Sequence, residues 1–144
     1  MENVLFSELD YSNLESGVGC SFVSSWNKFN NEQLTGEALA CRLLKTDSTV
    51  IIAGDNPLKK VFGFVCFKPY TSPILSTECV EICALFVDPF MQKKGIGKAL
   101  LTQAESQVRT RLFVSADQSA VPFYVACGYN LSGSVGMTRY RHMT

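Results

Sequence analysis

The sequence has a single histidine, no net charge and no long apolar run, and each shortage excludes a class of protein. Thirteen basic side chains balance thirteen acidic ones, so the chain lacks the positive excess that favours nucleic acids and anionic membranes. No stretch approaches the ~20 apolar residues of a membrane-spanning helix. The first residues also lack the basic and apolar regions of a signal peptide. We therefore expect a cytoplasmic protein that binds neither nucleic acid nor membrane.

Patterns typical of metal sites and disulfide frameworks are also missing. None of the six cysteines forms a Cys-x-x-Cys pair, and the only histidine, His142, lies near the C-terminus. Zinc sites need closely spaced cysteine and histidine ligands, so we expect no metal. Cysteines in a reducing compartment behave as small apolar residues, and we expect buried free thiols here.

The composition is that of one folded domain. Apolar residues make up 47% of the 144 residues and charged residues 18%. A chain of this length buries roughly 70% of its unfolded surface, so it folds without disulfides. We expect a single domain over residues 1–144.

Hydrophobic periodicity predicts the element order β-α-α-β-β-β-α-β-α-β-β. Helices mixed with a sheet that contains a hairpin imply an α/β or α+β fold. Residues 10–31 are the hardest to assign, because Gly17 and Gly19 weaken the helix that their apolar spacing favours. The predicted elements are strand 4–9, helix 35–44, strands 49–53, 61–67 and 79–87, helix 95–108, strand 112–116, helix 120–127, and two short strands within 129–140.

The most informative region is the strand 79–87 with the turn and helix that follow it. The strand is apolar almost throughout, which predicts a central strand covered on both faces. Asp88-Pro89 ends it, because proline cannot donate to a ladder. The turn reads Gln92-Lys93-Lys94-Gly95-Ile96-Gly97-Lys98. Free amides and the helix dipole make such a helix start an anion site, and glycine lets a phosphate approach the backbone.

The turn alone leaves two interpretations open. It has neither the spacing of a Walker A loop nor the six-position dinucleotide fingerprint. Its two glycines are also compatible with an ordinary strand-to-helix turn. Three lysines beside a helix N-terminus oppose the dipole, however, unless an anion is bound there.

At these residues the sequence resembles the GNAT superfamily of acyl-CoA-dependent N-acetyltransferases, whose strand and helix flank a Gln/Arg-x-x-Gly-x-Gly/Ala turn. Residues 120–124 and 127–129 resemble the family's second signature, a helix with an inward tyrosine followed by Gly-Phe/Tyr. The resemblance covers residues 79–129. It implies a single domain with a mixed, mostly antiparallel sheet and helices on both faces, and acetyl-CoA as co-substrate.

The resemblance also implies roles for individual residues. The backbone of Leu85, Phe86 and Val87 would pair with the pantetheine arm, and Tyr124 would face the sulfur. Many members carry Asn seven residues before this tyrosine, where Asp117 stands here, and an anion there would repel a phosphate. The pyrophosphate would be held at the turn by Gln92, Lys93, Lys94, Gly95, Ile96, Gly97 and Lys98.

Glu81 and Tyr124 are the candidate catalytic residues. A carboxylate in an apolar strand is costly to bury, which makes Glu81 a candidate base; an ion pair or a partly exposed position is the alternative. The phenol of Tyr124 is suited to protonate a thiolate, and a core aromatic is the alternative. Cys83 shares a strand face with Glu81, and we expect it to pack in the core. Trp26 and Phe29 either line an acceptor pocket or pack.

The predicted function is transfer of an acetyl group from acetyl-CoA directly to a primary amine, without a covalent intermediate on the protein. A non-catalytic acyl-CoA-binding or regulatory module and a nucleotide-binding domain are the alternatives. The acceptor can be a small molecule, a peptide N-terminus or a lysine. A homodimer is one of the open oligomeric states.

Overall fold

The structure is a computed structural model that describes residues 4–12, 14–15, 17–55, 59–71, 78–108, 111–115, 119–131 and 136–140. Its helices are α1 (Gly17–Asn30), α2 (Gly36–Lys45), α3 (Ile96–Ser106) and α4 (Val121–Ala126), with a 3₁₀ turn η1 (Pro89–Met91). Its strands are β1 (Leu5–Glu8), β2 (Thr49–Gly54), β3 (Val61–Thr71), β4 (Glu78–Val87), β5 (Arg111–Ser115), β6 (Asn130–Leu131) and β7 (Gly136–Tyr140). The predicted element order is confirmed, with η1 added.

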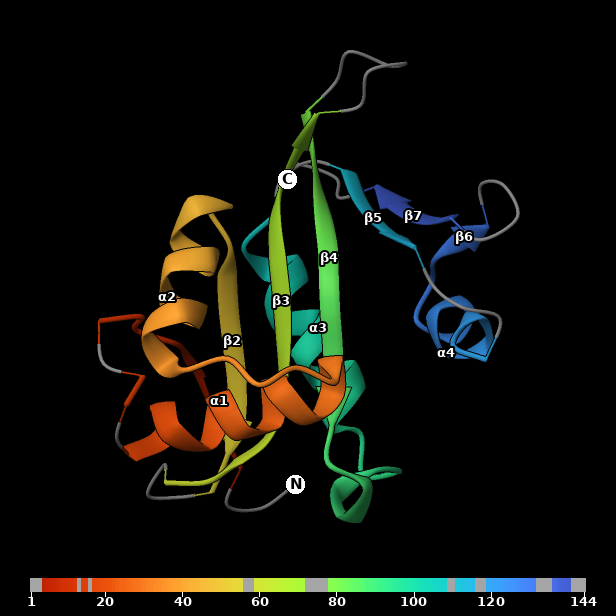
Figure 1. The fold of residues 1–144 in the computed structure, drawn as a ribbon. Coiled ribbons are helices and arrows are strands. Elements are labelled where there is room, and N and C mark those ends of the chain that lie inside the picture. Colours follow the sequence, from red (N-terminus) through yellow and green to blue (C-terminus); the bar gives the residue numbers. More distant parts are fainter. Residues whose placement is uncertain are drawn as a thin grey trace.

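The strands form one seven-stranded sheet in the order β1-β2-β3-β4-β5-β7-β6 (Figure 1). β4 and β5 run parallel, and the other described neighbours are antiparallel. The predicted mixed, mostly antiparallel sheet is therefore confirmed. The antiparallel pairing of β2 with β3 also confirms the predicted hairpin.

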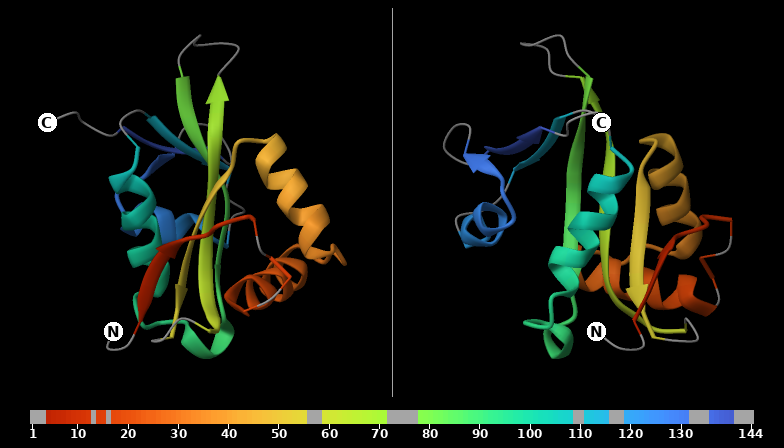
Figure 2. Two further views of the ribbon diagram at one scale, coloured as in Figure 1. Left: turned by 90° about the vertical axis from the view of Figure 1, so that its left-hand side faces the viewer. Right: turned by 180° about the vertical axis from the view of Figure 1, so that it is seen from behind.

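Helices cover both faces of this sheet, as expected (Figure 2). The α1 and α2 side is built around Phe22 and Leu39, which pack on Phe64 of β3. The opposite side is built from α3 and the first strands, with Leu100 against Val65. Packing of Phe22 and Trp26 explains why the glycines of α1 do not prevent the helix. The predicted apolar stripe of α3 is buried throughout, at Ile96, Leu100, Leu101, Ala104 and Val108.

β4 carries a bulge in its middle. Cys66 of β3 lies opposite Ala84, whereas the next residue, Phe67, lies opposite Ile82, so Cys83 is the extra residue. The bulge changes the phase of the strand. Ile82 packs on the α3 side, and Ala84, two residues further, packs on the α1 and α2 side.

β4 and β5 separate just after this point. Their pairing runs from Cys79 opposite Arg111 to Ile82 opposite Val114 and then stops. β4 continues to Val87, and no described strand pairs with that edge of its last five residues, 83–87. Figure 1 shows β5 and β7 diverging from β4. The sheet is therefore split at its centre.

The expectation that the cysteines are buried is wrong for three of the six. Cys66 and Cys79 are buried, but Cys20, Cys41 and Cys83 are exposed. Cys20 and Cys41 lie on outer faces of α1 and α2. Cys83 is turned out of the core by the bulge, so the expected core packing of its side chain is also wrong.

The described residues contain neither a membrane-spanning helix nor a cluster of metal ligands. Within those ranges, each helix is too short or too polar to cross a bilayer. Nor do three cysteine, histidine or acidic side chains of those ranges converge as metal ligands would. His142 and Asp117 lie outside the described residues.

Replacement of Leu100 by alanine is expected to lower the free energy of unfolding by about 2–5 kcal/mol, because a fully buried side chain leaves a cavity. Leu44 is 67% exposed, so Leu44→Ala is the matched control and should change stability by less than about 0.5 kcal/mol. Chemical denaturation measures both. Equal losses in the two variants would contradict the assigned core.

Candidate active site

The turn between β4 and α3 is held by polar contacts to the neighbouring strands. The amide of Asp88 donates to the carbonyl of Phe62 at 2.7 Å, and the Asp88 carboxylate accepts from the amide of Phe90 at 3.0 Å. The side-chain Nε2 of Gln92 donates to the carbonyl of Val87 at 3.1 Å. The turn is therefore fixed to the end of β4 before any ligand binds.

Backbone amides at the start of α3 have no hydrogen-bond partner among the described residues. Gly95 is the N-cap residue, with φ of 83°, and no side chain caps the helix. Lys93 also has a positive φ, of 63°. Turns that include left-handed residues direct successive N–H groups into one concavity that binds anions. Lys93, Lys94 and Lys98 are exposed and form no ion pair with a described residue, so their charges are available to an anion.

A cavity of about 430 Å³ opens at this turn. Its walls include most of the residues predicted to hold the coenzyme; the side chains of Phe86 and Lys94 are not among them. Phe86 packs instead on the α1 and α2 core, because its side chain lies on the opposite face of β4. The lining residues are Leu85, Val87, Met91, Gln92, Lys93, Gly95, Ile96, Gly97, Lys98 and Phe123.

A second cavity, of about 210 Å³, lies where β4 and β5 separate. Leu85 lines both cavities, so they adjoin along the free edge of β4. The second cavity has walls from both faces of the sheet, because Ala84 belongs to the α1 and α2 core and Tyr124 to the α3 core. It is lined by Phe29, Ile82, Cys83, Ala84, Leu85, Val114, Ser115, Ala120 and Tyr124.

Tyr124 presents a buried phenol to this second cavity. The residue is 5% exposed, and its ring contacts those of Phe123 and Tyr129 at centroid distances of 5.2 and 5.4 Å. Its hydroxyl makes no hydrogen bond with a described residue. Burial, with a smaller contribution from Cys127, raises the pKa of Tyr124 to about 12. The phenol is therefore protonated at neutral pH and available to a ligand.

A family model described as the acetyltransferase (GNAT) family matches residues 16–129. The chain belongs to the GNAT acetyltransferase family. Members use acetyl-CoA as co-substrate, and the protein is an acyltransferase. Such a coenzyme offers a diphosphate, peptide-like amides and a thioester. The open amides at α3, the free edge of β4 and the phenol of Tyr124, which no described residue hydrogen-bonds, fit these groups.

Solved structures share the GNAT fold at low sequence identity. An acetyltransferase from Trypanosoma brucei is 16% identical, with a TM-score of 0.73, covering 92% of this chain and 96% of its own. AtaTR bound with acetyl-CoA is 19% identical, with a TM-score of 0.72 and coverage of 97% and 94%. Glucosamine-6-phosphate N-acetyltransferase from Arabidopsis thaliana is 14% identical, with a TM-score of 0.72 and coverage of 92% and 95%. No curated protein matches the sequence.

Glu81 does not line the cavity at the turn or the cavity between β4 and β5, although its neighbour Ile82 lines the second. Its carboxylate Oε1 is 3.9 Å from Nζ of Lys68, and its side chain is 27% exposed. The ion pair that the sequence left as an alternative is therefore present. Val80 and Ile82 pack on the α3 side, so Glu81 faces the α1 and α2 side.

The two aromatic residues that the sequence left unassigned have different positions. Trp26 is 7% exposed and packs in the core, stacked on Phe64. Phe29 is 43% exposed and lines the cavity between β4 and β5. Sequence reasoning also missed Phe123, which lines the turn cavity next to Tyr124; its place beside that tyrosine in a short helix was the only available signal.

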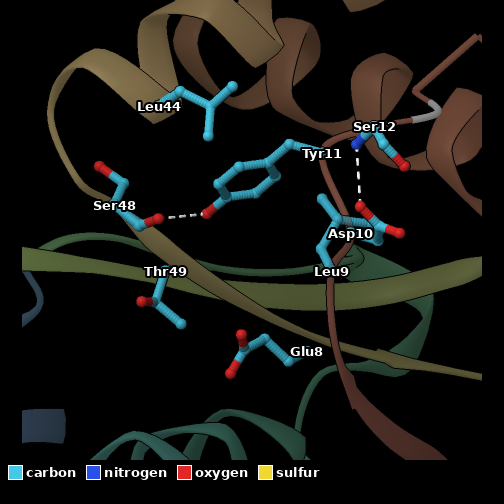
Figure 3. A pocket seen from close by; sticks show the side chains of 8 residues that line it. All are labelled: Glu8, Leu9, Asp10, Tyr11, Ser12, Leu44, Ser48 and Thr49. Carbon is cyan, nitrogen blue, oxygen red and sulfur yellow. Dashed lines mark hydrogen bonds between the residues drawn. The ribbon is translucent and has the colours of Figure 1, made fainter.

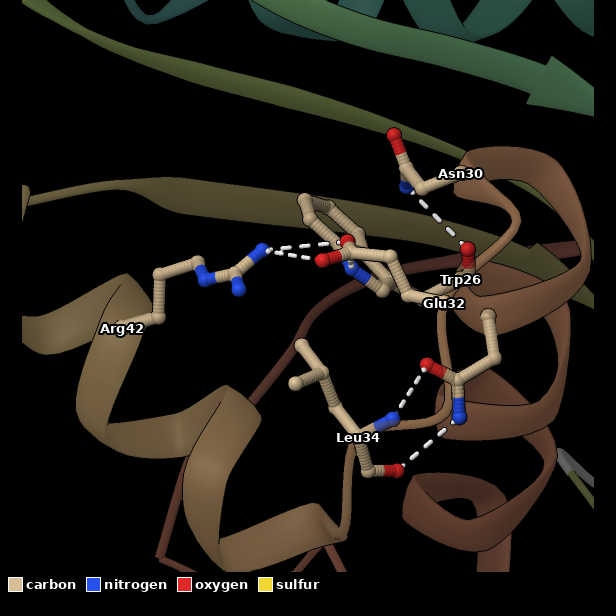
Figure 4. Close-up of polar contacts among 6 residues, drawn as sticks. Trp26, Asn30, Glu32, Leu34 and Arg42 are labelled. Carbon is tan, nitrogen blue, oxygen red and sulfur yellow. Dashed lines mark hydrogen bonds and ion pairs between the residues drawn. The ribbon is translucent and has the colours of Figure 1, made fainter.

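Polar contacts hold the segment that follows α1 (Figure 4). Nε1 of Trp26 donates to Glu32 Oε1 at 3.1 Å, and Nη1 of Arg42 lies 2.9 Å from Glu32 Oε2. Asn27 exchanges two hydrogen bonds with the backbone of Leu34. These contacts tie the end of α1 to α2.

A further cavity, of about 520 Å³, lies between β1 and α2, away from the predicted site residues (Figure 3). The hydroxyl of Tyr11 donates to the carbonyl of Ser48 across it. Burial, together with the nearby Cys66 and Glu8, raises the pKa of Tyr11 well above its ordinary value. Tyr11 therefore ties the N-terminal segment to the strand edge.

Replacement of Gly95 by alanine should weaken acetyl-CoA binding, because φ of +83° is unfavourable for a residue with a Cβ and the amides would shift. Gly17 has φ of +60° and open space around its Cβ position, as Gly95 does. Gly17→Ala is therefore the matched control, with a similar cost of roughly 1–2 kcal/mol in stability. The increase in Tm that acetyl-CoA causes should be smaller only in the Gly95 variant. Equal increases in Tm in the two variants would contradict the assignment of this turn to the coenzyme site.

Proposed function

We propose that the protein transfers an acetyl group from acetyl-CoA to a primary amine by direct transfer. The observation that carries the proposal is the buried phenol of Tyr124, which has no hydrogen-bond partner among the described residues and lies beside the free edge of β4. A site that only bound an acyl-CoA would need the edge and the amides but not a buried proton donor. The acceptor amine belongs to a small molecule, a peptide N-terminus or a lysine.

The coenzyme would be held along one edge of β4 and at the start of α3. Amides of residues 93–98 and the exposed lysines would bind the diphosphate. Backbone groups of Leu85, Phe86 and Val87 would pair with the amides of the pantetheine arm, as an added strand would. Asp117, outside the described residues, stays a prediction.

The acceptor would approach from the α1 and α2 side. Phe29 lines the cavity there, and Glu81 faces the same side of β4. An amine arrives protonated and must lose a proton before it attacks. Because Glu81 is not on the cavity wall, we assign it proton acceptance through a water.

Tyr124 would act on the other product. The amine nitrogen forms a bond to the thioester carbonyl carbon, the C–S bond breaks, and the sulfur leaves with the electron pair. The phenol donates its proton to this thiolate. The proton that the ammonium loses before attack passes to Glu81, and the second proton, which the nitrogen loses as the amide forms, restores the phenol of Tyr124. Since burial keeps the pKa of Tyr124 at about 12, the phenol carries its proton throughout the physiological range.

Replacement of Tyr124 by phenylalanine should lower kcat about 100-fold with the KM for acetyl-CoA unchanged, because only the proton donor is lost. The deficit should be constant between about pH 6 and 9, where a phenol of pKa about 12 stays protonated. Steady-state kinetics measures both. Tyr129→Phe is the control, because it also removes one phenol hydroxyl, here bonded to Glu105 at 3.1 Å. An unchanged kcat in the Tyr124 variant would contradict the proton-donor role of its phenol, whereas absence of turnover in the unchanged protein would favour the non-catalytic alternative.

Replacement of Glu81 by glutamine should lower kcat/KM for the amine about 100-fold and flatten the acid limb of the pH–rate profile, because an amide accepts no proton. Lys68→Met is the matched control, since it breaks the same ion pair and leaves the carboxylate. If Glu81 served only the ion pair, the two variants would show equal and small effects.

A further inference from the structure

The bulge in β4 places two cysteines side by side. Cys83 is the inserted residue, and Cys66 lies opposite the next residue, Ala84, in the β3–β4 ladder. Ala84 and Cys66 both pack on the α1 and α2 side. The thiol of Cys66 is within hydrogen-bonding reach of that of Cys83. The two sulfurs are therefore neighbours across two adjacent strands.

The two thiols differ in accessibility and in the direction in which their pKa values are shifted. Cys83 is exposed and lines the cavity between β4 and β5, whereas Cys66 is 1% exposed. Hydrogen bonding from Cys66 lowers the pKa of Cys83, and Lys68 adds to this while Glu81 and desolvation oppose it. The same hydrogen bond and burial raise the pKa of Cys66. The pair thus combines an accessible sulfur inclined to ionise with a protonated neighbour.

Other accessible cysteines lack this arrangement. Cys20 on α1 and Cys41 on α2 are exposed, and neither has a polar contact with a described residue. They provide thiols of similar exposure for comparison within the same chain. The pairing at the bulge is therefore what distinguishes Cys83 from them.

We propose that Cys83 and Cys66 form an oxidation-sensitive pair, in which hydrogen peroxide oxidises Cys83 and Cys66 then closes a disulfide with it. In the first step the Cys83 thiolate attacks one peroxide oxygen, the O–O bond breaks, and hydroxide leaves to become water. In the second step the Cys66 sulfur attacks the Cys83 sulfenic sulfur, and the S–O bond breaks. The hydroxide leaves with the proton of Cys66 as a second water. Two thiols are oxidised and one peroxide is reduced.

Disulfide formation would change the wall of the reaction cavity. The sulfur of Cys83 lies 3.6 Å from the carbonyl oxygen of Glu81 and contributes to the cavity lining. Bonding to the buried Cys66 would draw it toward β3 and restrain the bulge. The expected loss of acetyl transfer rests on the proposed function; formation of the disulfide does not.

The test is peroxide titration of the full chain, followed by intact mass and peptide mapping under non-reducing conditions. We expect a mass lower by two hydrogens and a linked peptide joining Cys66 and Cys83. Cys83 should react about tenfold faster than Cys41, because peroxide reacts with the thiolate. Acetyl transfer should fall severalfold and return with dithiothreitol.

Three variants make the test decisive. Cys83→Ser should form no internal disulfide, and Cys41→Ser should behave as the unchanged protein. Cys66→Ala should stop at a Cys83 sulfenic acid that dimedone traps.

Oxidation that follows exposure alone, with Cys20 and Cys41 modified first and no link between Cys66 and Cys83, would overturn the proposal. Peptide mapping of the disulfide does not depend on turnover. If no sample acetylates an amine, the proposed function is refuted, while the mapping still decides whether the thiol pair forms.

Discussion

The site depends on the early end of one parallel strand pair. Backbone N–H and C=O groups need hydrogen-bond partners, and a strand inside a sheet normally finds them on both sides. β4 has them on both sides only as far as Ile82, opposite Val114. Beyond it, β3 is the only described strand that pairs with β4, and the other edge of β4 borders the two cavities. In the proposed function, an extended ligand would take the place of a strand at this edge.

The split is supported by packing on both faces. The β3–β4 ladder extends from Gly63 opposite Val87 to Thr71 opposite Glu78, so β4 stays in place without β5. Phe64 and Phe86 pack together on one face, and Leu100 of α3 packs on the other. Two cores thus hold the free edge rigid, and the ligand need not order it on binding.

The remaining parts of the site follow from where β4 ends. The strand leads into a turn fixed by Asp88 and Gln92, and that turn places the open amides of α3 at one end of the free edge. At the other end, the bulge at Cys83 adjoins Tyr124 of α4. The open amides, the free strand edge and the phenol of Tyr124 therefore follow one another along β4. The bulge also brings Cys83 to Cys66, so the same irregularity accounts for the inferred thiol pair.

Local patterns in the sequence were sufficient for the elements and for the turn. Apolar runs, the Thr35 cap, which accepts from the amide of Ala38 at 3.1 Å, and the left-handed Gly128 are local features, because each depends on neighbouring residues in the chain. The glycines and lysines of residues 92–98 indicated the anion site for the same reason. Tyr124 was found through the family signature.

What the sequence determined by itself was the order of the elements, the two-faced burial of β4 and the glycine turn that begins α3. Only the tertiary structure decided that β4 and β5 part after Ile82, that Cys83 leaves the core and that Glu81 pairs with Lys68. It also separated Phe29, on the cavity wall, from Trp26 in the core. These features arise from register and from contacts between segments distant in the chain, and period-two alternation carries no information about a bulge that interrupts it.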